Sequence, residues 1–354
     1  MYKYLQLLKR ILLIFLYKVF CLFKIDNNKV ILYSPSNYKL KGNLFEIYTA
    51  LVDKNVKVFF KEKNIISFLY HVATSKVIIT DDFAPIMYVL KIRKEIKFIQ
   101  VWHASGAFKS VGFKRPTVNK NSLSHKNYTD VIVSSTNIVD DYSEAFGIDK
   151  SKIHALGTIK TDLFYNKERL KNIKKYIYKK YNLKNKKIIL YAPTFRGSGI
   201  KSAHFENMLN LDRLIKKLGK DYVILFKNHP FVNDTTTFKS ENVINISKED
   251  EIDYILPFID LLITDYSSVI FDAIINKKPV IYYVPDLKEY KKSRGFYYDF
   301  EEYNYGKIVS TQKDLIETIK NPVMDKKKMK QIKEKHINMC DGKSLERFMN
   351  MYFN

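Results

Sequence analysis

Short apolar runs rich in β-branched residues alternate with helical patterns along both halves of the chain after residue 28. In the first half, the runs that predict strands are KVILYS (29–34), VKVFF (56–60), KVIIT (76–80), KFIQVW (97–102) and DVIVSS (130–135). In the second half they are KKIILYAP (186–193), YVILFK (222–227), NVINI (242–246), DLLIT (260–264), PVIYY (279–283) and KIVS (307–310). Uninterrupted apolar runs are typical of parallel strands buried on both faces. The alternation therefore predicts an α/β protein with two doubly wound, Rossmann-like domains.

A lysine-rich segment, residues 166–187, separates the two series of strands and predicts a helical linker with a solvated face. We therefore expect an N-terminal helix in residues 1–27, one domain in 28–165 and a second in 166–354. ILYSPSNYK (31–39) resembles ILYAPTFRG (189–197), which indicates similar architectures in the two domains. Ligands of open α/β sheets bind beyond the carboxyl ends of the strands. Two such sheets facing each other would form an interdomain cleft.

The first 25 residues are apolar and aromatic but are interrupted by Lys3, Lys9, Arg10, Lys18 and Lys24. The apolar stretch between Arg10 and Lys24 is shorter than the roughly 20 residues that a membrane-spanning helix needs. No small-residue cleavage site follows, so the segment does not resemble a signal peptide. It predicts a basic amphipathic helix lying on an anionic membrane surface. The alternative is a helix packed on the protein's own core.

Charge and cysteine content narrow the possible partners. The formal net charge of +24, from 61 basic and 37 acidic side chains, favours anionic lipids or phosphate-rich substrates. The sequence contains no zinc-finger, homeodomain or RNP signature, so nucleic acid is not an expected partner. Only Cys21 and Cys340 are present, which predicts no disulfide framework and fits a reducing cytoplasm.

The segment DLLITDYSSVIFD (260–272) places polar side chains directly after a buried strand. Asp265 turns the chain, and Ser267 or Ser268 is a suitable N-cap for the following helix. Free N–H groups and two hydroxyls at a helix start can bind a diphosphate. Helix capping alone would explain the same residues. Glycine-rich dinucleotide and Walker sequences are absent, which argues against those nucleotide sites.

Two further strand ends carry cationic or titratable side chains. In LYAPTFRGSG (190–199), Thr194 and Arg196 enter a Gly/Ser turn, and a guanidinium can bind a phosphate through two hydrogen bonds. A surface arginine in a loop is the alternative. In ILFKNHPF (224–231), His229 follows a strand and precedes Pro230, which favours extended backbone.

VWHASGAFKSVG (101–112) places His103 at a strand end in the first domain, as His229 is placed in the second. Imidazole suits proton transfer near neutral pH. Each histidine alone could be a core residue, but two at equivalent sheet edges favour a shared cleft. Gly106 would let the backbone approach a ligand closely, and Lys109 would add positive charge near a phosphate.

Asp81 and Asp82 in IITDDFAP also follow a strand. Adjacent acids on alternate faces make a poor chelate, so we expect no metal site there.

In this order, VWHASGAFKSVG, YAPTFR, KNHPF, TDYSSVIFD, YKKSRGFYYDF and DGKSLERF (341–348) resemble the CDP-glycerol glycerophosphotransferase family of teichoic acid biosynthesis. The resemblance covers roughly residues 30 to 350. It implies a GT-B fold and transfer of a polyol phosphate, glycerol phosphate first, from CDP-glycerol to a hydroxyl of a lipid-linked saccharide acceptor. The reaction would release CMP at the cytoplasmic membrane face, without a cofactor. CDP-ribitol is the alternative donor.

The resemblance also implies roles for individual residues. His103 would be the general base, and His229 would stabilise the phosphate or the leaving group. Substrate contacts would involve Gly106, Lys109, Thr194, Arg196, Lys227, Thr264, Asp265, Ser267, Ser268, Asp272 and Arg294.

Ala104 follows the histidine where many members have glycine, which is closer to members that add the first unit. GTIKTD (157–162) also departs from the family pattern. Two other functions remain open at this point: a GT-B glycosyltransferase that uses a nucleotide sugar, and a basic adaptor that binds nucleic acid or membrane without catalysis. A homo-oligomer is also possible.

Overall fold

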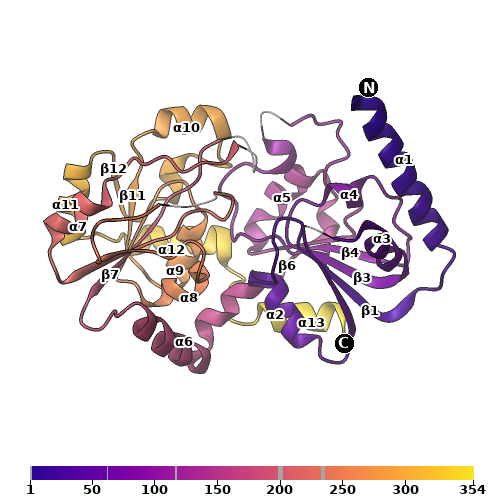
Figure 1. Ribbon diagram of the computed structural model, residues 1–354, viewed down its shortest axis with the longest axis horizontal. Coiled ribbons are helices and arrows are strands. Elements are labelled where there is room, and N and C mark those ends of the chain that lie inside the picture. The colour runs from indigo at the N-terminus through magenta and orange to yellow at the C-terminus, as the bar shows by residue number, and fades with distance from the viewer. Residues whose placement is uncertain (1, 62, 116–117, 198–201, 233–235) are drawn as a thin grey trace. The chain divides into compact units, whose positions relative to one another are not determined.

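The computed structural model describes residues 2–61, 63–115, 118–197, 202–232 and 236–354 (Figure 1). The chain divides into two compact units, and each is described by itself. The first unit comprises Met1–Asp162 and Asn338–Asn354, and the second comprises Leu163–Ile337.

The first unit is built on a six-stranded parallel sheet with the strand order β2-β1-β3-β4-β5-β6. Its strands are β1 (Asp26–Tyr33), β2 (Asn55–Phe59), β3 (Ser75–Thr80), β4 (Lys97–Gln100), β5 (Asp130–Val133) and β6 (Ile153–Ala155). Val30 in β1 pairs with Val56 on one side and with Val77 on the other. The strand order reverses between β1 and β3, so their carboxyl ends form the switch point at which such sheets bind ligands.

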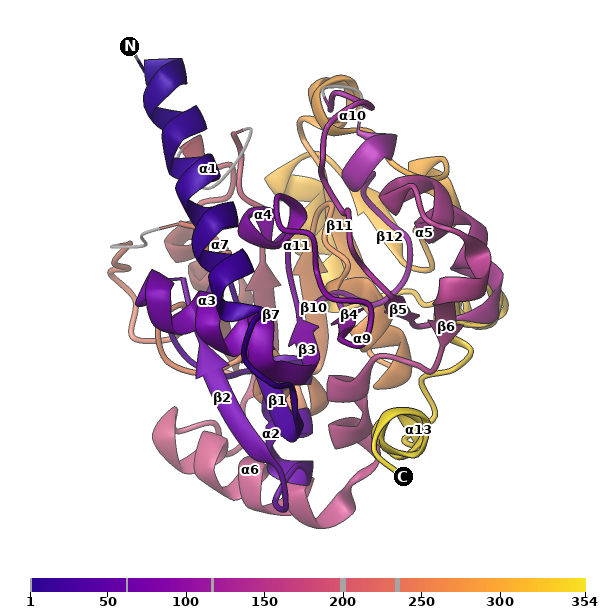
Figure 2. The same cartoon turned by 90° about the vertical axis from the view of Figure 1, so that its right-hand side faces the viewer.

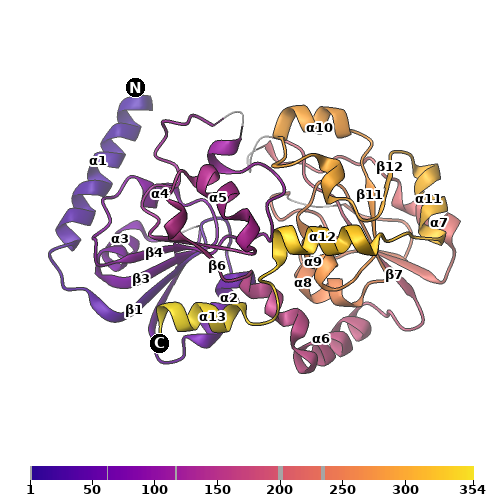
Figure 3. The ribbon, with the colours of Figure 1, turned by 180° about the vertical axis from the view of Figure 1, so that it is seen from behind.

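Helices cover both faces of this sheet. They are α1 (Tyr2–Phe20), α2 (Gly42–Ala50), α3 (Ile65–Thr74), α4 (Pro85–Tyr88), α5 (Val139–Phe146) and α13 (Ser344–Tyr352). On one face lie α2 and α13 (Figure 3). Leu44 of α2 and Phe348 of α13 are fully buried in one apolar cluster with strand residues. On the other face, the ring of Phe68 in α3 lies 4.7 Å from that of Tyr33 in β1.

The last residues of the chain belong to the first unit, whereas the sequence placed all of 166–354 in the second domain. The reason is the burial of Phe348 against the first sheet. The backbone N–H of Leu345 also donates to Asp162 Oδ2 at 2.8 Å. The two units divide after Asp162, and the sequence analysis placed this boundary after residue 165.

The second unit contains another six-stranded parallel sheet, with the order β12-β11-β10-β7-β8-β9. Its strands are β7 (Lys187–Ala192), β8 (Tyr222–Phe226), β9 (Val243–Asn245), β10 (Leu261–Thr264), β11 (Val280–Tyr283) and β12 (Lys307–Val309). Here the strand order reverses between β7 and β10. The switch point therefore lies beyond Ala192 and Thr264.

The helices of the second unit are α6 (Lys167–Lys180), α7 (Leu211–Leu218), α8 (Ile252–Ile255), α9 (Val269–Ile275), α10 (Leu287–Arg294), α11 (Gln312–Lys320) and α12 (Lys326–Ile337). Leu214 of α7 and Leu315 of α11 bury one face of the sheet. On the other side, the ring of Phe271 in α9 packs 5.0 Å from His336 of α12. The expected linker helix is α6, and the side chain of Asn166 caps it by accepting from Arg169 N–H.

Every strand expected from an apolar run is present, and the differences are at strand ends. The run KFIQVW ends as a strand at Gln100. Trp102 has a φ of 50°, in the left-handed region that interrupts extended backbone. The sequence missed β6, a strand of three residues with only one fully buried side chain.

The N-terminal segment forms a helix, α1, whose second half packs on α3 (Figure 2). Tyr17 is buried, and the ring of Phe20 meets Tyr70 of α3 edge to face at 5.7 Å. The guanidinium of Arg93 donates to the carbonyl oxygens of Cys21 and Phe23 after the helix end. None of the helices among the described residues is both long and apolar enough to cross a bilayer.

Asp130 joins three strands of the first sheet. Burial raises the pKa of its carboxyl, but hydrogen bonds from His154 and Thr129 and the charge of Lys97 outweigh this and lower it to about 2. The His154 Nε2 to Asp130 Oδ1 distance is 2.9 Å. Because the pKa of Asp130 in the folded protein lies below the ordinary pKa of an aspartate, the ionised carboxyl stabilises the fold at pH values above that ordinary pKa. This stabilisation is lost as the pH falls from about 4 to 2.

We therefore expect Asp130→Asn to lower the unfolding free energy by roughly 2 kcal/mol at pH 7. The difference in unfolding free energy between the variant and wild type should be smaller at pH 3. Urea unfolding at pH 7 and pH 3 measures both free energies. An equal loss at both pH values would contradict the electrostatic explanation. Asp140→Asn, at an exposed carboxylate, is the control and should change little.

Candidate active site

A buried hydroxyl-carboxylate pair closes the switch point of the first sheet. Ser34, directly after β1, donates its Oγ–H to the carboxylate of Asp81, directly after β3, with oxygen distances of 3.0 and 2.9 Å. Burial and the neighbouring charge of Asp82 raise the pKa of Asp81 to about 6, although His103 and the Ser34 hydrogen bond oppose the shift. The pair fixes the ends of β1 and β3 relative to each other.

His103 lies beyond the carboxyl end of the next strand, β4, as the sequence predicted. Its side chain is 53% exposed, and its Nδ1 lies 3.1 Å from the backbone oxygen of Asp81. The same nitrogen is 3.9 Å from Oδ1 of Asp82. The imidazole also stacks on the indole of Trp102, with ring centroids 4.7 Å apart. One edge of the ring is thus held by the protein.

The turn that carries His103 is held by two amide side chains. Asn43 of α2 donates to the carbonyl oxygens of Val101 and Trp102 at 3.0 and 2.7 Å. Gln100 accepts from the N–H of Trp102 at 2.9 Å. These bonds satisfy backbone groups that have no partner in the sheet, because the strand ends where Trp102 adopts positive φ. They stabilise a conformation that costs free energy for a bulky residue.

The loop after His103 is packed inward at Gly106, where we had expected it to approach a ligand. The N–H of Gly106 donates to Ser134 Oγ at 2.8 Å, and its carbonyl accepts from the Tyr142 hydroxyl at 3.0 Å. Its φ of 68° explains the glycine, because this region is strained for other residues. Lys109 lies further along the loop and is half-buried.

In the second unit, the equivalent switch point is closed by Thr194 and Asp265. Both the N–H and the hydroxyl of Thr194, after β7, donate to Asp265 Oδ1, at 2.8 and 2.6 Å. Thr264 is fully buried and donates to the carbonyl of Ala192 at 2.6 Å. These hydrogen bonds join the carboxyl ends of β7 and β10.

Arg196 completes this cluster by binding carboxylates. Its Nε and Nη2 form a two-pronged interaction with Asp286, at 2.8 and 3.1 Å, and its Nη1 donates to Asp265 at 3.1 Å. The guanidinium carbon lies 5.3 and 5.1 Å from the ring centroids of Tyr266 and Tyr290. We had expected Arg196 to bind phosphate, whereas here all three of its nitrogens engage protein groups. Residues 198–201 of the predicted turn lie outside the described residues.

His229 follows β8, as predicted. Its Nδ1 accepts the N–H of Phe231 at 3.2 Å, so the neutral ring carries its proton on Nε2. The ring packs 4.6 Å from Phe195, which lies between Thr194 and Arg196 in the chain. Lys227 donates to the carbonyl oxygens of Ser247 and Asp250, at 2.9 and 2.6 Å. Its ammonium group holds the loop after β9.

The serines of the predicted phosphate site precede α9. Ser268 occupies the N-cap position, but its side chain does not cap the helix, because its backbone is already helical with φ −63° and ψ −8°. Both serines are half-buried, and Asp272 is buried one turn later. Arg294 ends α10, and its side chain lies outside the described residues.

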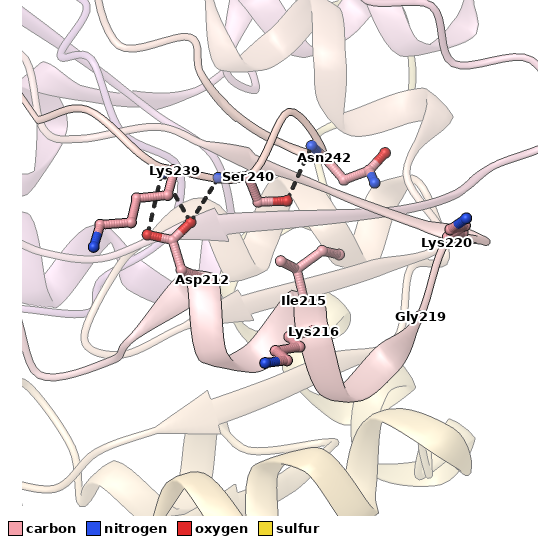
Figure 4. A pocket seen from close by; sticks show the side chains of 8 residues that line it. All are labelled: Asp212, Ile215, Lys216, Gly219, Lys220, Lys239, Ser240 and Asn242. Carbon is pink, nitrogen blue, oxygen red and sulfur yellow. Dashed lines mark hydrogen bonds between the residues drawn. The ribbon is translucent and has the colours of Figure 1, made fainter.

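Two cavities lie away from the strand ends discussed above. One, of about 440 Å³, is lined by Asp212, Ile215 and Lys216 of α7 and by residues before β8 and β9 (Figure 4). It lies at the amino ends of these strands. The other, of about 1010 Å³, belongs to the first unit and is lined by residues between Phe113 and Lys152. Neither cavity includes any predicted site residue.

The sequence did not identify Asn43, Gln100, Asp286 or Tyr290 as parts of the site. Asn43 follows a glycine at a helix start, and Gln100 interrupts an apolar strand, which were the available signals. Tyr290 begins the segment YKKSRGFYYDF on which the family resemblance partly rests, whereas Asp286 carries no comparable signal. Among the described residues, no group of three histidine, cysteine or acidic side chains could hold a metal ion.

Known proteins similar to this chain include wall teichoic acid enzymes. The teichoic acid poly(ribitol-phosphate) polymerase of Bacillus spizizenii is 38% identical over 95% of this chain and 58% of its own length. The ribitol-phosphate polymerase TarK of Staphylococcus aureus is 35% identical over 94% of this chain and 70% of its own length. The glycerol-phosphate primase of Bacillus subtilis is 31% identical over 93% and 89%. The chain thus spans less than two thirds of the first of these relatives.

Among solved structures, the wall teichoic acid polymerase TagF matches with a TM-score of 0.81 at 22% identity, over 99% of this chain and 96% of that one. A UDP-GlcNAc 2-epimerase from Methanocaldococcus jannaschii matches with a TM-score of 0.53 at 14% identity, over 91% and 98%. The two parallel six-stranded sheets therefore form a GT-B fold. The family model described as CDP-glycerol:poly(glycerophosphate) glycerophosphotransferase matches residues 15–354, and the chain belongs to that family.

Proposed function

We propose that this protein transfers a polyol phosphate from a CDP-polyol to a hydroxyl of a lipid-linked teichoic acid precursor and releases CMP. The observation that carries the proposal is His103, a half-exposed imidazole at a strand end within a chain that matches this family along nearly its whole length. Its Nδ1 faces the carbonyl of Asp81, which leaves Nε2 for proton transfer.

Glycerol and ribitol are both candidates for the transferred polyol. The sequence analysis named glycerol first, with ribitol as the alternative. Relatives named for ribitol phosphate are 35 to 38% identical to this chain, and those named for glycerol phosphate are 30 to 31% identical. This difference favours CDP-ribitol as the first donor to test, with CDP-glycerol beside it.

The proposed reaction is a displacement at the β-phosphorus of the donor. The acceptor hydroxyl gives its proton to Nε2 of His103, and its oxygen forms a bond to the β-phosphorus. The bond between that phosphorus and the bridging oxygen breaks, and CMP leaves with the bonding electrons. Positioning and charge stabilisation supply most of the catalysis in such phosphoryl transfers.

His229 and the serines before α9 are the proposed donor contacts. The Nδ1 of His229 accepts Phe231 N–H, so the neutral ring carries its proton on Nε2, and we propose that this N–H group donates to a phosphate oxygen of the donor. Ser267 and Ser268 are half-buried beyond β10, beside the buried pair Thr194 and Asp265. We propose that Arg196 acts by fixing Asp265 and Asp286 beneath these contacts.

We also propose that α1 holds the enzyme on the cytoplasmic face of the membrane. Leu8, Leu12 and Phe15 are 62%, 56% and 61% exposed, although they are large and apolar. Lys9, Arg10 and Lys18 are exposed on the same helix. Exposed apolar side chains with interspersed lysine and arginine suit an interface helix on anionic lipid.

Purified full-length protein should release CMP from CDP-ribitol or CDP-glycerol when a soluble lipid-disaccharide analogue is present. Mass spectrometry should show the acceptor heavier by one or more polyol phosphates. UDP-sugars should give no product. Sugar addition in place of polyol phosphate would support the glycosyltransferase alternative and overturn the proposal.

His103→Ala and His229→Ala should each lower kcat by at least roughly 100-fold, because each removes a group proposed to act in the transfer. His204→Ala replaces an exposed histidine and is the matched control. Thermal unfolding shows whether the variants remain folded. Near-full activity in a folded His103→Ala variant would contradict the base assignment.

Arg196→Lys should destabilise the donor-free protein by roughly 2 kcal/mol, because lysine cannot form the two-pronged bond to Asp286 while also reaching Asp265. Donor affinity should fall in the same variant. Arg213→Lys, at an exposed position of α7, is the control. Weaker donor binding with unchanged stability would indicate that Arg196 instead binds the donor directly.

Phe15→Glu should weaken binding to phosphatidylglycerol vesicles by roughly tenfold or more, since it removes a large apolar group from the interface and adds negative charge. Vesicle flotation measures the bound fraction. Val323→Glu changes a 64% exposed apolar residue of the second unit and should leave binding unchanged. Equal loss in both variants would argue against α1 as the membrane contact.

A further inference from the structure

Asp82 is an acidic residue close to the proposed base that the transfer chemistry above leaves without a role. It directly follows Asp81 beyond β3, and its side chain is 15% exposed. Its Oδ1 lies 3.9 Å from Nδ1 of His103. This separation is longer than a hydrogen bond but within the range where a carboxylate stabilises an adjacent positive charge.

The backbone carbonyl of Asp81 favours the tautomer of His103 with its proton on Nδ1. This oxygen lies 3.1 Å from Nδ1 and can only accept a hydrogen bond. The neutral imidazole therefore has its proton on Nδ1 and a lone pair on Nε2. Protonation of Nε2 then yields an imidazolium whose Nδ1 side faces Asp82.

Asp82 itself is held in place from two directions. Its Oδ1 accepts the N–H of Phe83 at 2.7 Å. Its backbone oxygen accepts from Nε2 of Gln100 at 3.1 Å, and the Oε1 of Gln100 accepts from Trp102 N–H at 2.9 Å. One glutamine thus ties the chain segment of Asp82 to the segment of His103.

The arrangement differs from a metal site. The Asp81 carboxylate is occupied by Ser34 and is buried, while the Asp82 carboxylate faces His103. The titratable groups recorded next to this imidazole are therefore Asp81 and Asp82. Among the described residues, Asp82 alone brings a carboxylate oxygen within 4.0 Å of a ring nitrogen of His103.

We propose that Asp82 is a positioning residue for His103, which holds the ring with its proton on Nδ1 and stabilises the imidazolium formed during transfer. The inference rests on the proposed role of His103 as base. The acceptor proton moves to Nε2, the Nδ1 proton stays in place, and the Nε2 proton passes to solvent after CMP leaves. Asp82 takes part in no bond change and acts on the ring as the carboxylate partner of a catalytic histidine does in other enzymes.

Asp82→Asn tests this role, because its amide removes the charge and offers an N–H group to Nδ1. We expect kcat to fall roughly tenfold or more, from the loss of one charge about 4 Å away, while KM for donor and acceptor changes less than about twofold. Asp82→Glu keeps the charge and should recover part of kcat. Asp53→Asn removes an exposed carboxylate from the same unit and is the matched control.

A second measurement does not depend on activity. ¹⁵N NMR of histidine-labelled protein reports which ring nitrogen carries the proton, and His103→Gln identifies the relevant signal. Wild type should show the Nδ1–H form, and Asp82→Asn should raise the Nε2–H fraction.

The outcomes separate this inference from the proposed function. Wild-type kcat and an unchanged tautomer in a folded Asp82→Asn variant would overturn the role of Asp82 and leave the transferase assignment intact. A wild-type ring with its proton on Nε2 would also overturn it. Absence of activity on every CDP-polyol would instead reject the proposed function, while the NMR result still decides whether Asp82 positions the ring.

Discussion

A buried carboxylate bound to a hydroxyl on a neighbouring strand end is the interaction on which both halves of the molecule depend. Ser34 binds Asp81 in the first sheet, and Thr194 binds Asp265 in the second. In each case the pair joins the two strands between which the strand order reverses. Helices cannot cover the strand ends at this switch point. Without the hydroxyl-carboxylate pair, the strand ends would expose unsatisfied polar groups. The same arrangement that stabilises each sheet thus leaves room for chemistry beyond it.

The strands were predictable because parallel strands covered on both faces must be apolar throughout. ILYS at 31–34 and ILYA at 189–192 are buried along nearly their whole length. The one missed strand, β6, is too short for its composition to distinguish it from a loop. The positions of His103, His229 and Asp265 at strand ends were predictable by the same logic, since polar residues directly after buried strands gather at the carboxyl edge of their own sheet.

The partners of those residues could not be predicted, because sequence separation conceals them. Asn43 and Trp102 are 59 residues apart, and Arg196 and Asp286 are 90 apart. A sequence shows that an arginine can bind a phosphate or a carboxylate but not which one lies within reach. Arg196 binds carboxylates in the folded protein because its guanidinium is largely buried. An unpaired buried charge would cost folding free energy. The role of Asp82 could not be predicted for the same reason, because its distance from His103 depends on the pairing of β3 with β4, whose partner residues are 20 apart in sequence.

The placement of α13 has a consequence for biosynthesis. Phe348 fills the apolar layer over the first sheet, yet it leaves the ribosome only after the whole second unit. Domains generally fold in the order of their synthesis. Here the first sheet would emerge with a gap in its covering layer that closes only once α13 has been synthesised. The nascent protein would therefore expose that apolar surface while the second unit is being made, and exposed apolar surface favours aggregation.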